Sequence, residues 1–184
     1  RPLKPRNRRR WPMAKISKNL QIVDDDWQVL RLAEGETAEG ISLPAGPLLV
    51  PLAVWQARRA ELGVRHKQGE PLGVWLGPFD EPADIAPDLS LFSLIGVDFP
   101  KFVDGRGYST ARLLRSRYGY TGELRSIGDV QRDQLFYQRR VGFDAYALRP
   151  DHDIEAALKS LYDFDAAYQH STDINIELRR RAAR

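Results

Sequence analysis

The chain has 184 residues, of which 42% are hydrophobic and 29% are charged, so it is long enough to fold as one globular domain around a buried core. It contains no cysteine, which excludes disulfides, thiol catalysis and thiolate-bound clusters. Its three histidines are far apart and lack the spacing of metal ligands, so no metal site is expected.

The formal net charge of +3 arises in the first twelve residues, RPLKPRNRRRWP, which carry six basic side chains and no acidic one. The remaining residues have a net charge of −3. A run of like charges interrupted by proline is typical of disordered chain. We therefore expect residues 1–12 to form a disordered basic extension, upstream of a native start at Met13. A basic arm for nucleic acid is the less favoured alternative.

The sequence gives no sign of membrane insertion or export. An apolar stretch at residues 41–55 contains three prolines and is shorter than the ~20 residues that a membrane-spanning helix needs. The arginine-rich start is not followed by the apolar region of a signal peptide. We expect a cytoplasmic protein without membrane contact.

Residues 14–33 alternate apolar and polar side chains in the manner of short strands, and the acidic triplet Asp24-Asp25-Asp26 interrupts them. We interpret the triplet as a turn exposed to solvent. Residues 34–46, rich in Glu, Gly, Ala and Pro, have the composition of a linker.

From residue 47 onward, apolar strand-like runs alternate with helical patterns. Strands are predicted at 48–52, 72–76, 92–99, 123–127 and 145–148. Helices are predicted at 53–68, 109–118, 130–141 and from 153 onward, with one or two helical turns in the connection 78–89.

Alternating strands and helices predict an α/β fold with about five βα units and a parallel sheet. The sheet is either open and doubly wound or a partial βα barrel, preceded by the short β-like segment. We expect a single α/β domain over 13–170 and a basic C-terminal tail over 171–184. Both architectures place a binding site at the carboxyl ends of the strands.

The segment DGRGYS, at residues 104–109, follows the most apolar strand and opens a helix. Glycines allow backbone N–H groups to approach a ligand, and a helix N-terminus attracts anions. We predict a small-anion site built from Gly105, Arg106, Gly107 and Ser109, with Ser109 as the helix N-cap. An ordinary Asp-Gly turn with solvated arginines is the alternative.

The next unit adds further candidates. Arg125 lies inside a predicted buried strand, where a guanidinium needs a partner, so it is expected to be buried beside a carboxylate or an anion. Asp129 and Arg132 follow the end of that strand and are candidates to face the DGRGYS loop. For Asp129, the favoured role is a cap on the next helix. Lys101, Asp104 and Arg149 complete a predicted cation-rich rim.

The chain also resembles a known family. The run GVDFPKFVDGRGYSTARLLRSRYGYTGELRSIGDVQRDQLFYQRRVGFDAYALR, the pieces PAGPLLVPLAVW and PLGVWLGP, and the start near MAKI are similar to bacterial proteins described as oxidoreductases of sulfite reduction. The resemblance implies a place in sulfate assimilation, beside sulfite reductase or a neighbouring sulfur-assimilation enzyme. It carries over no catalytic residues.

We therefore expect a cytoplasmic accessory protein of assimilatory sulfite reduction that binds a small anion or the reductase. The alternative is an oxidoreductase that binds a flavin or NAD(P) at the DGRGYS loop. The sequence lacks cysteine ligands for an iron–sulfur cluster and a complete dinucleotide motif. A structural subunit that contacts its partner through exposed Trp75, Phe79 and Tyr137 is a third hypothesis.

Overall fold

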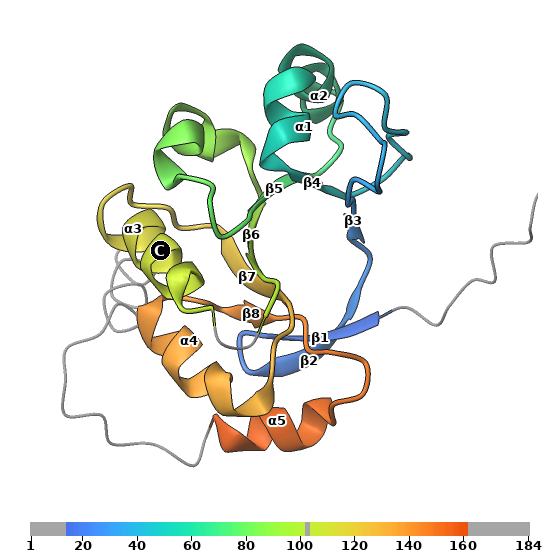
Figure 1. Cartoon of the computed structure of the whole chain (residues 1–184). Coiled ribbons are helices and arrows are strands. Elements are labelled where there is room, and N and C mark those ends of the chain that lie inside the picture. The colour runs from blue at the N-terminus through green and yellow to red at the C-terminus, as the bar shows by residue number, and fades with distance from the viewer. Residues whose placement is uncertain (1–13, 102–103, 162–184) are drawn as a thin grey trace, which may run out of the picture.

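A computed structural model describes residues 14–101 and 104–161, whose backbone forms one eight-stranded sheet (Figure 1). The expectations for the basic extension 1–12, the start at Met13 and the tail 171–184 lie outside the described residues, as does the continuation of the last helix beyond residue 161.

The sheet has the order β2-β1-β8-β7-β6-β5-β4-β3. Its parallel part consists of β3 (Gln28–Val29), β4 (Leu48–Pro51), β5 (Leu72–Leu76), β6 (Leu94–Phe99), β7 (Glu123–Gly128) and β8 (Ala145–Tyr146). An antiparallel hairpin, β1 (Ala14–Lys18) and β2 (Gln21–Asp25), continues the sheet beyond β8.

All five predicted strands are present, but the prediction of a purely parallel sheet of five strands is wrong. The described sheet is mixed and larger, because the N-terminal segment adds three strands to it. The hairpin turns at Asn19 and Leu20, whose positive φ angles of 49° and 62° suit a tight two-residue connection. The acidic triplet is therefore not a turn, since Asp24 and Asp25 belong to β2.

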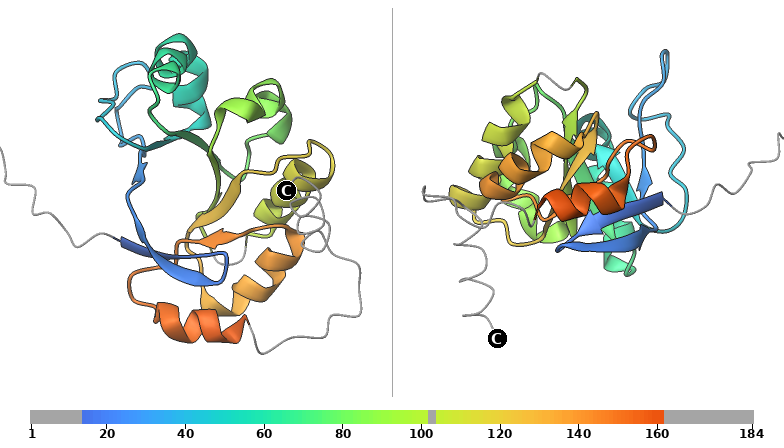
Figure 2. Two further views of the ribbon diagram at one scale, coloured as in Figure 1. Left: turned by 180° about the vertical axis from the view of Figure 1, so that it is seen from behind. Right: turned by 90° about the horizontal axis from the view of Figure 1, so that it is seen from below.

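Strands β4 to β8 lie side by side in their order along the chain. This order lacks the reversal of a doubly wound sheet, so the partial-barrel alternative is the one observed. Figures 1 and 2 show the sheet curled, with the helices on its convex side. The edge strands β2 and β3 are joined by only Asp26 and Trp27, so the chain itself links the two edges of the sheet.

The described helical segments are α1 (Leu52–Ala57), α2 (Arg59–Lys67), η1 (Pro82–Leu91), α3 (Arg106–Ser116), η2 (Arg132–Gln134), α4 (Leu135–Val141) and α5 (Ile154–Ser160). The single helix predicted over 53–68 is interrupted at Arg58, where φ is −121° and ψ is 28°. None of the described helices combines the length and apolar character needed to cross a membrane.

The two faces of the curled sheet are packed differently. The outer face carries the main apolar core, in which Val50, Val74 and Val97 pack with residues of the surrounding helices. The inner face carries a smaller apolar cluster around Leu49, Leu94 and Ile127, together with Trp27 and Trp75. Since side chains alternate along a strand, the residues between the outer-facing ones project into the interior of the curled sheet.

Candidate anion pocket at the start of helix α3

The DGRGYS segment begins its helix earlier than predicted. Helix α3 starts at Arg106 after the N-cap Gly105, so Ser109 lies within the first turn and its predicted role as N-cap is wrong. The Asp104 carboxylate accepts the backbone N–H of Arg106 at 3.1 Å. A side-chain acceptor placed before Arg106 satisfies one of the free N–H groups at the start of the helix, which favours the earlier beginning.

Arg106 also binds Asp104 through its side chain. Its Nε lies 3.0 Å from Asp104 Oδ1 and its Nη2 lies 2.8 Å from Asp104 Oδ2, so the ion pair is bidentate. The hydrogen bonds from the Arg106 side chain and backbone lower the pKa of Asp104, and the same side-chain bond raises the pKa of Arg106. The guanidinium carbon lies 4.3 Å from the centre of the Phe79 ring. Arg106 is thus held between a carboxylate and an aromatic ring.

These residues form one wall of an open pocket of about 790 Å³. The lining comes from the loop after β5 and from the β6–α3 connection: Pro78, Phe79, Pro100, Lys101, Asp104, Gly105, Arg106 and Ser109. The structure therefore brings three predicted site residues, Gly105, Arg106 and Ser109, to one pocket at the carboxyl ends of β5 and β6.

Gly107 has a packing role instead. It is buried, and a Cβ atom there would lie 2.6 Å from the ring carbon Cζ of Phe99 and 3.1 Å from Val97. Its small size lets α3 approach β6 closely. By contrast, a Cβ on Gly105 would meet nothing within 4 Å.

The predicted burial of Arg125 beside a carboxylate is confirmed. Its guanidinium binds Glu123 at 2.6 Å and Asp25 at 2.9 Å, and Lys18 binds the other oxygen of Glu123 at 2.6 Å. The strand is central, and Arg125 points into the interior of the curled sheet, at the level of Gly96 on β6. It does not line the anion pocket.

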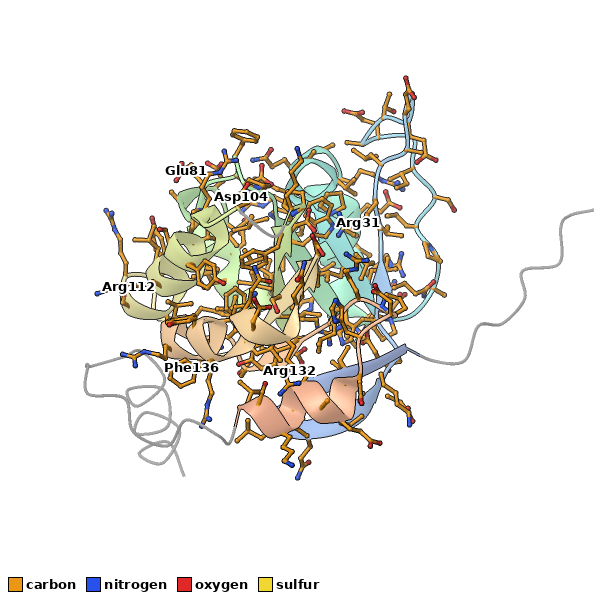
Figure 3. The ribbon with its side chains drawn as sticks, turned by 60° about the horizontal axis from the view of Figure 1, so that its bottom comes forward. Arg31, Glu81, Asp104, Arg112, Arg132 and Phe136 are labelled. Atoms are coloured by element: carbon orange, nitrogen blue, oxygen red, sulfur yellow. The ribbon has the colours of Figure 1, made fainter. Side chains whose placement is uncertain are left out.

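Asp129 and Arg132 also lie outside the residues that line this pocket. Asp129 binds Arg149 Nη1 at 3.1 Å, whereas η2 is capped by a reciprocal pair of hydrogen bonds between Gln131 and Gln134. The expectation that Asp129 caps this helix is therefore wrong. Figure 3 shows Arg132 near α5, well separated from Asp104.

Sequence reasoning missed a polar contact at the carboxyl end of β6. The buried Asp98 carboxylate binds Arg31 Nη2 at 2.7 Å, and the guanidinium of Arg31 lies 4.9 Å from the centre of the Trp75 ring. Trp75 is half-buried, unlike the exposed surface residue expected, and its Nε1 donates to Leu30 O at 2.9 Å. The available signal was Asp98 itself, a carboxylate within the apolar run LIGVDF, which required a partner.

The rim at the carboxyl ends is less cationic than its composition indicates. Arg31, Arg106 and Arg149 each pair with a carboxylate of the chain. Lys101 and Arg132 are exposed and form no ion pair with any residue in the described ranges. Lys101 is therefore the cation of the pocket whose charge no described carboxylate offsets.

The sequence was also compared with known proteins. A family model described as "Bacterial protein of unknown function (DUF934)" matches residues 73–177, which include the whole pocket lining and the strands from most of β5 to β8. No curated protein matches the sequence significantly. Because the family model matches more than half of the chain, the protein belongs to the DUF934 family of bacterial proteins.

Proposed function

We propose that the protein is an accessory protein of assimilatory sulfite reduction that binds a small anion in the pocket at the start of α3. The pocket carries this proposal, because it gathers Lys101, Arg106 and the hydroxyl of Ser109 at one place. The pathway half of the proposal rests on the resemblance of the DGRGYS and GDVQRDQ segments. In this proposal, sulfite reductase or a neighbouring sulfur-assimilation enzyme is the partner and supplies the redox cofactors.

The charges of the pocket set how an anion would bind. Lys101 provides a positive charge without a described carboxylate partner, whereas Asp104 already neutralises Arg106. An anion that reaches Arg106 must compete with Asp104 for the same guanidinium edge. Binding through both cations therefore requires Arg106 to exchange one anionic partner for another, so Asp104 limits the affinity.

Two substitutions should change anion binding in opposite directions. Arg106→Ala removes the charge-assisted hydrogen bonds and is expected to weaken binding by about 1.5–3 kcal/mol. Asp104→Asn keeps an oxygen for the backbone N–H of Arg106 but removes the competing charge, so it should tighten binding. Calorimetric titration with sulfite, sulfate and phosphate measures both effects.

Arg112→Ala is the matched control for this titration. Arg112 is exposed on the same helix, and Figure 3 shows it directed away from the molecule, far from Asp104. Its removal changes the net charge equally and should leave binding unchanged. The anion assignment is wrong if none of the three anions binds at millimolar concentration, or if the Arg106 and Arg112 variants bind equally.

The pathway half is tested by deleting the gene in its host. We expect loss of growth on sulfate and on sulfite, with rescue by sulfide or cysteine. Complementation by the Arg106→Ala variant separates the two halves of the proposal, because a scaffold without anion binding would still restore growth. Normal growth on every sulfur source would remove the protein from this pathway.

A second candidate function is an oxidoreductase that binds a flavin or NAD(P) in the same pocket. Its support is the Phe79 ring, 83% exposed, in a pocket of about 790 Å³. That volume lies within the range of about 300–1,000 Å³ of drug- and cofactor-sized sites and is large for an oxyanion. Titration with FMN and NADPH tests it, and Phe79→Ala should weaken nucleotide binding while leaving sulfite binding intact.

A further inference from the structure

We propose that the Asp98 carboxylate and the Trp75 ring form a binding site for a guanidinium or ammonium compound, and that Arg31 is its internal, displaceable occupant. This cation site lies inside the curled sheet, at the carboxyl ends of β5 and β6, and shares no residue with the anion pocket. It is therefore independent of the function proposed above.

The geometry is that of a site for a cation. Asp98 is only 7% exposed, and its Oδ1 lies 2.7 Å from Arg31 Nη2. The guanidinium also lies over the Trp75 ring, with 4.9 Å between its carbon and the ring centre. A carboxylate and an aromatic face are the two groups that stabilise a partly desolvated cation. Gly128 leaves room for the carboxylate, since a Cβ there would lie 2.7 Å from Asp98 Oδ1.

Arg31 is attached loosely enough to leave. It is half exposed and begins a segment, residues 31–40, that lies between β3 and β4. Among the described hydrogen bonds, those of residues 32–40 stay within the segment or reach the adjoining Ile41, whose N–H donates to Thr37 O at 3.1 Å. Of the described residues 31–40, Arg31 is therefore the one that hydrogen-bonds to the sheet, and Ala38 packs against the core. Segments with few hydrogen bonds to the body and high exposure open at low cost in free energy.

The buried Asp98 carboxylate favours binding of a replacement cation. When Arg31 moves away, a buried carboxylate is left without its charged partner, which is strongly unfavourable. A small compound with a guanidinium or ammonium group restores both the ion pair and the contact with Trp75. Its affinity for the native protein is reduced by the fraction of time that Arg31 occupies the site.

The experiment uses ethylguanidinium as the probe. Arg31→Ala empties the site, so the probe should raise the melting temperature of this variant in a saturable way. The probe should also bind the variant at least tenfold more tightly than it binds the native protein. Arg31→Ala with Asp98→Asn should lose this response, because the amide carries no charge. The matched control is Arg112→Ala, since Arg112 is exposed and forms no ion pair with any described residue, so its removal changes the net charge equally without emptying a cation site.

Hydrogen exchange in the native protein provides a readout that does not depend on how well the variants fold. Ethylguanidinium should speed amide exchange in residues 32–40 and leave α2 unchanged. The tripeptide Gly-Arg-Gly is a second probe. It shows whether the cation site accepts an arginine side chain of a partner protein as well as a free small compound. The proposal is overturned if the probe stabilises the Arg31 and Arg112 variants equally, if the Asp98→Asn change leaves the response intact, or if exchange in 32–40 stays constant.

Discussion

Replacing Arg115 by methionine is expected to lower the free energy of unfolding by about 3–5 kcal/mol, because it removes one partner from a buried ionic contact. Arg115 is 2% exposed at the end of α3. Its Nε donates to Gly142 O at 2.9 Å, and its Nη1 donates to Tyr120 O and to Gly122 O, both at 2.8 Å. Its Nη2 lies 3.3 Å from Asp144 Oδ2.

These contacts explain the size of the expected effect. A single guanidinium joins the loop after α3, the end of α4 and the residue before β8, so its loss leaves several buried carbonyl groups without their donor. Methionine keeps most of the apolar stem, which separates the polar loss from a cavity effect.

Urea denaturation measures this effect against a neighbouring control. Arg117→Met lies two residues further on and is exposed, so it should change stability by no more than about 0.5 kcal/mol. A decrease of less than about 1 kcal/mol in the free energy of unfolding of the Arg115 variant would show that the guanidinium contributes little to the stability of this region.

The second large effect is expected at Arg125. Arg125→Met removes the cation that both Glu123 and Asp25 bind, and leaves the half-exposed Lys18, bound to Glu123, as the remaining cation of this described cluster. We expect a loss of about 3–5 kcal/mol in the free energy of unfolding, as for other broken buried ion pairs.

A double variant distinguishes unpaired charge from lost packing. Arg125→Met with Glu123→Met removes both a cation and an anion, so the remaining apolar side chains should recover at least half of the stability lost by the single variant. Urea denaturation of both variants decides the matter. Equal losses in the single and double variants would assign the effect to packing around Arg125 and contradict the charge argument.

The strands were predictable because their residues carry a local signal. The doubly apolar run LGVWL matches β5 over residues 72–76, and the parallel arrangement followed from the alternation of strands with helices. The hairpin β1–β2 was misread at Asp24-Asp25-Asp26, because acidic residues are usually solvated. Asp25 instead binds Arg125, 100 positions away in the sequence, a pairing that no local pattern can indicate.

The site was predictable only in part, for a similar reason. DGRGYS was correctly placed at the carboxyl end of a strand, and four of its residues, Asp104, Gly105, Arg106 and Ser109, line the pocket. The beginning of α3 was misplaced, since the interaction of Asp104 with Arg106 outweighs the capping preference of Ser109. The pair of Arg31 and Asp98 remained unrecognised, because Arg31 lies at the end of the strand-like segment 14–33 and Asp98 lies on a strand 67 positions further on.

The pairing of β1 with β8 governs when the fold can be completed. During synthesis, the hairpin β1–β2 leaves the ribosome before β8 and cannot pair with it until residues 145–146 have emerged. The hairpin lacks this partner while residues 26–144 are being synthesised, and such long-range closure slows folding. A chain shortened to the family-matched residues 73–177 would lack β1 to β4 and expose the edges of β5 and β8, which are templates for aggregation.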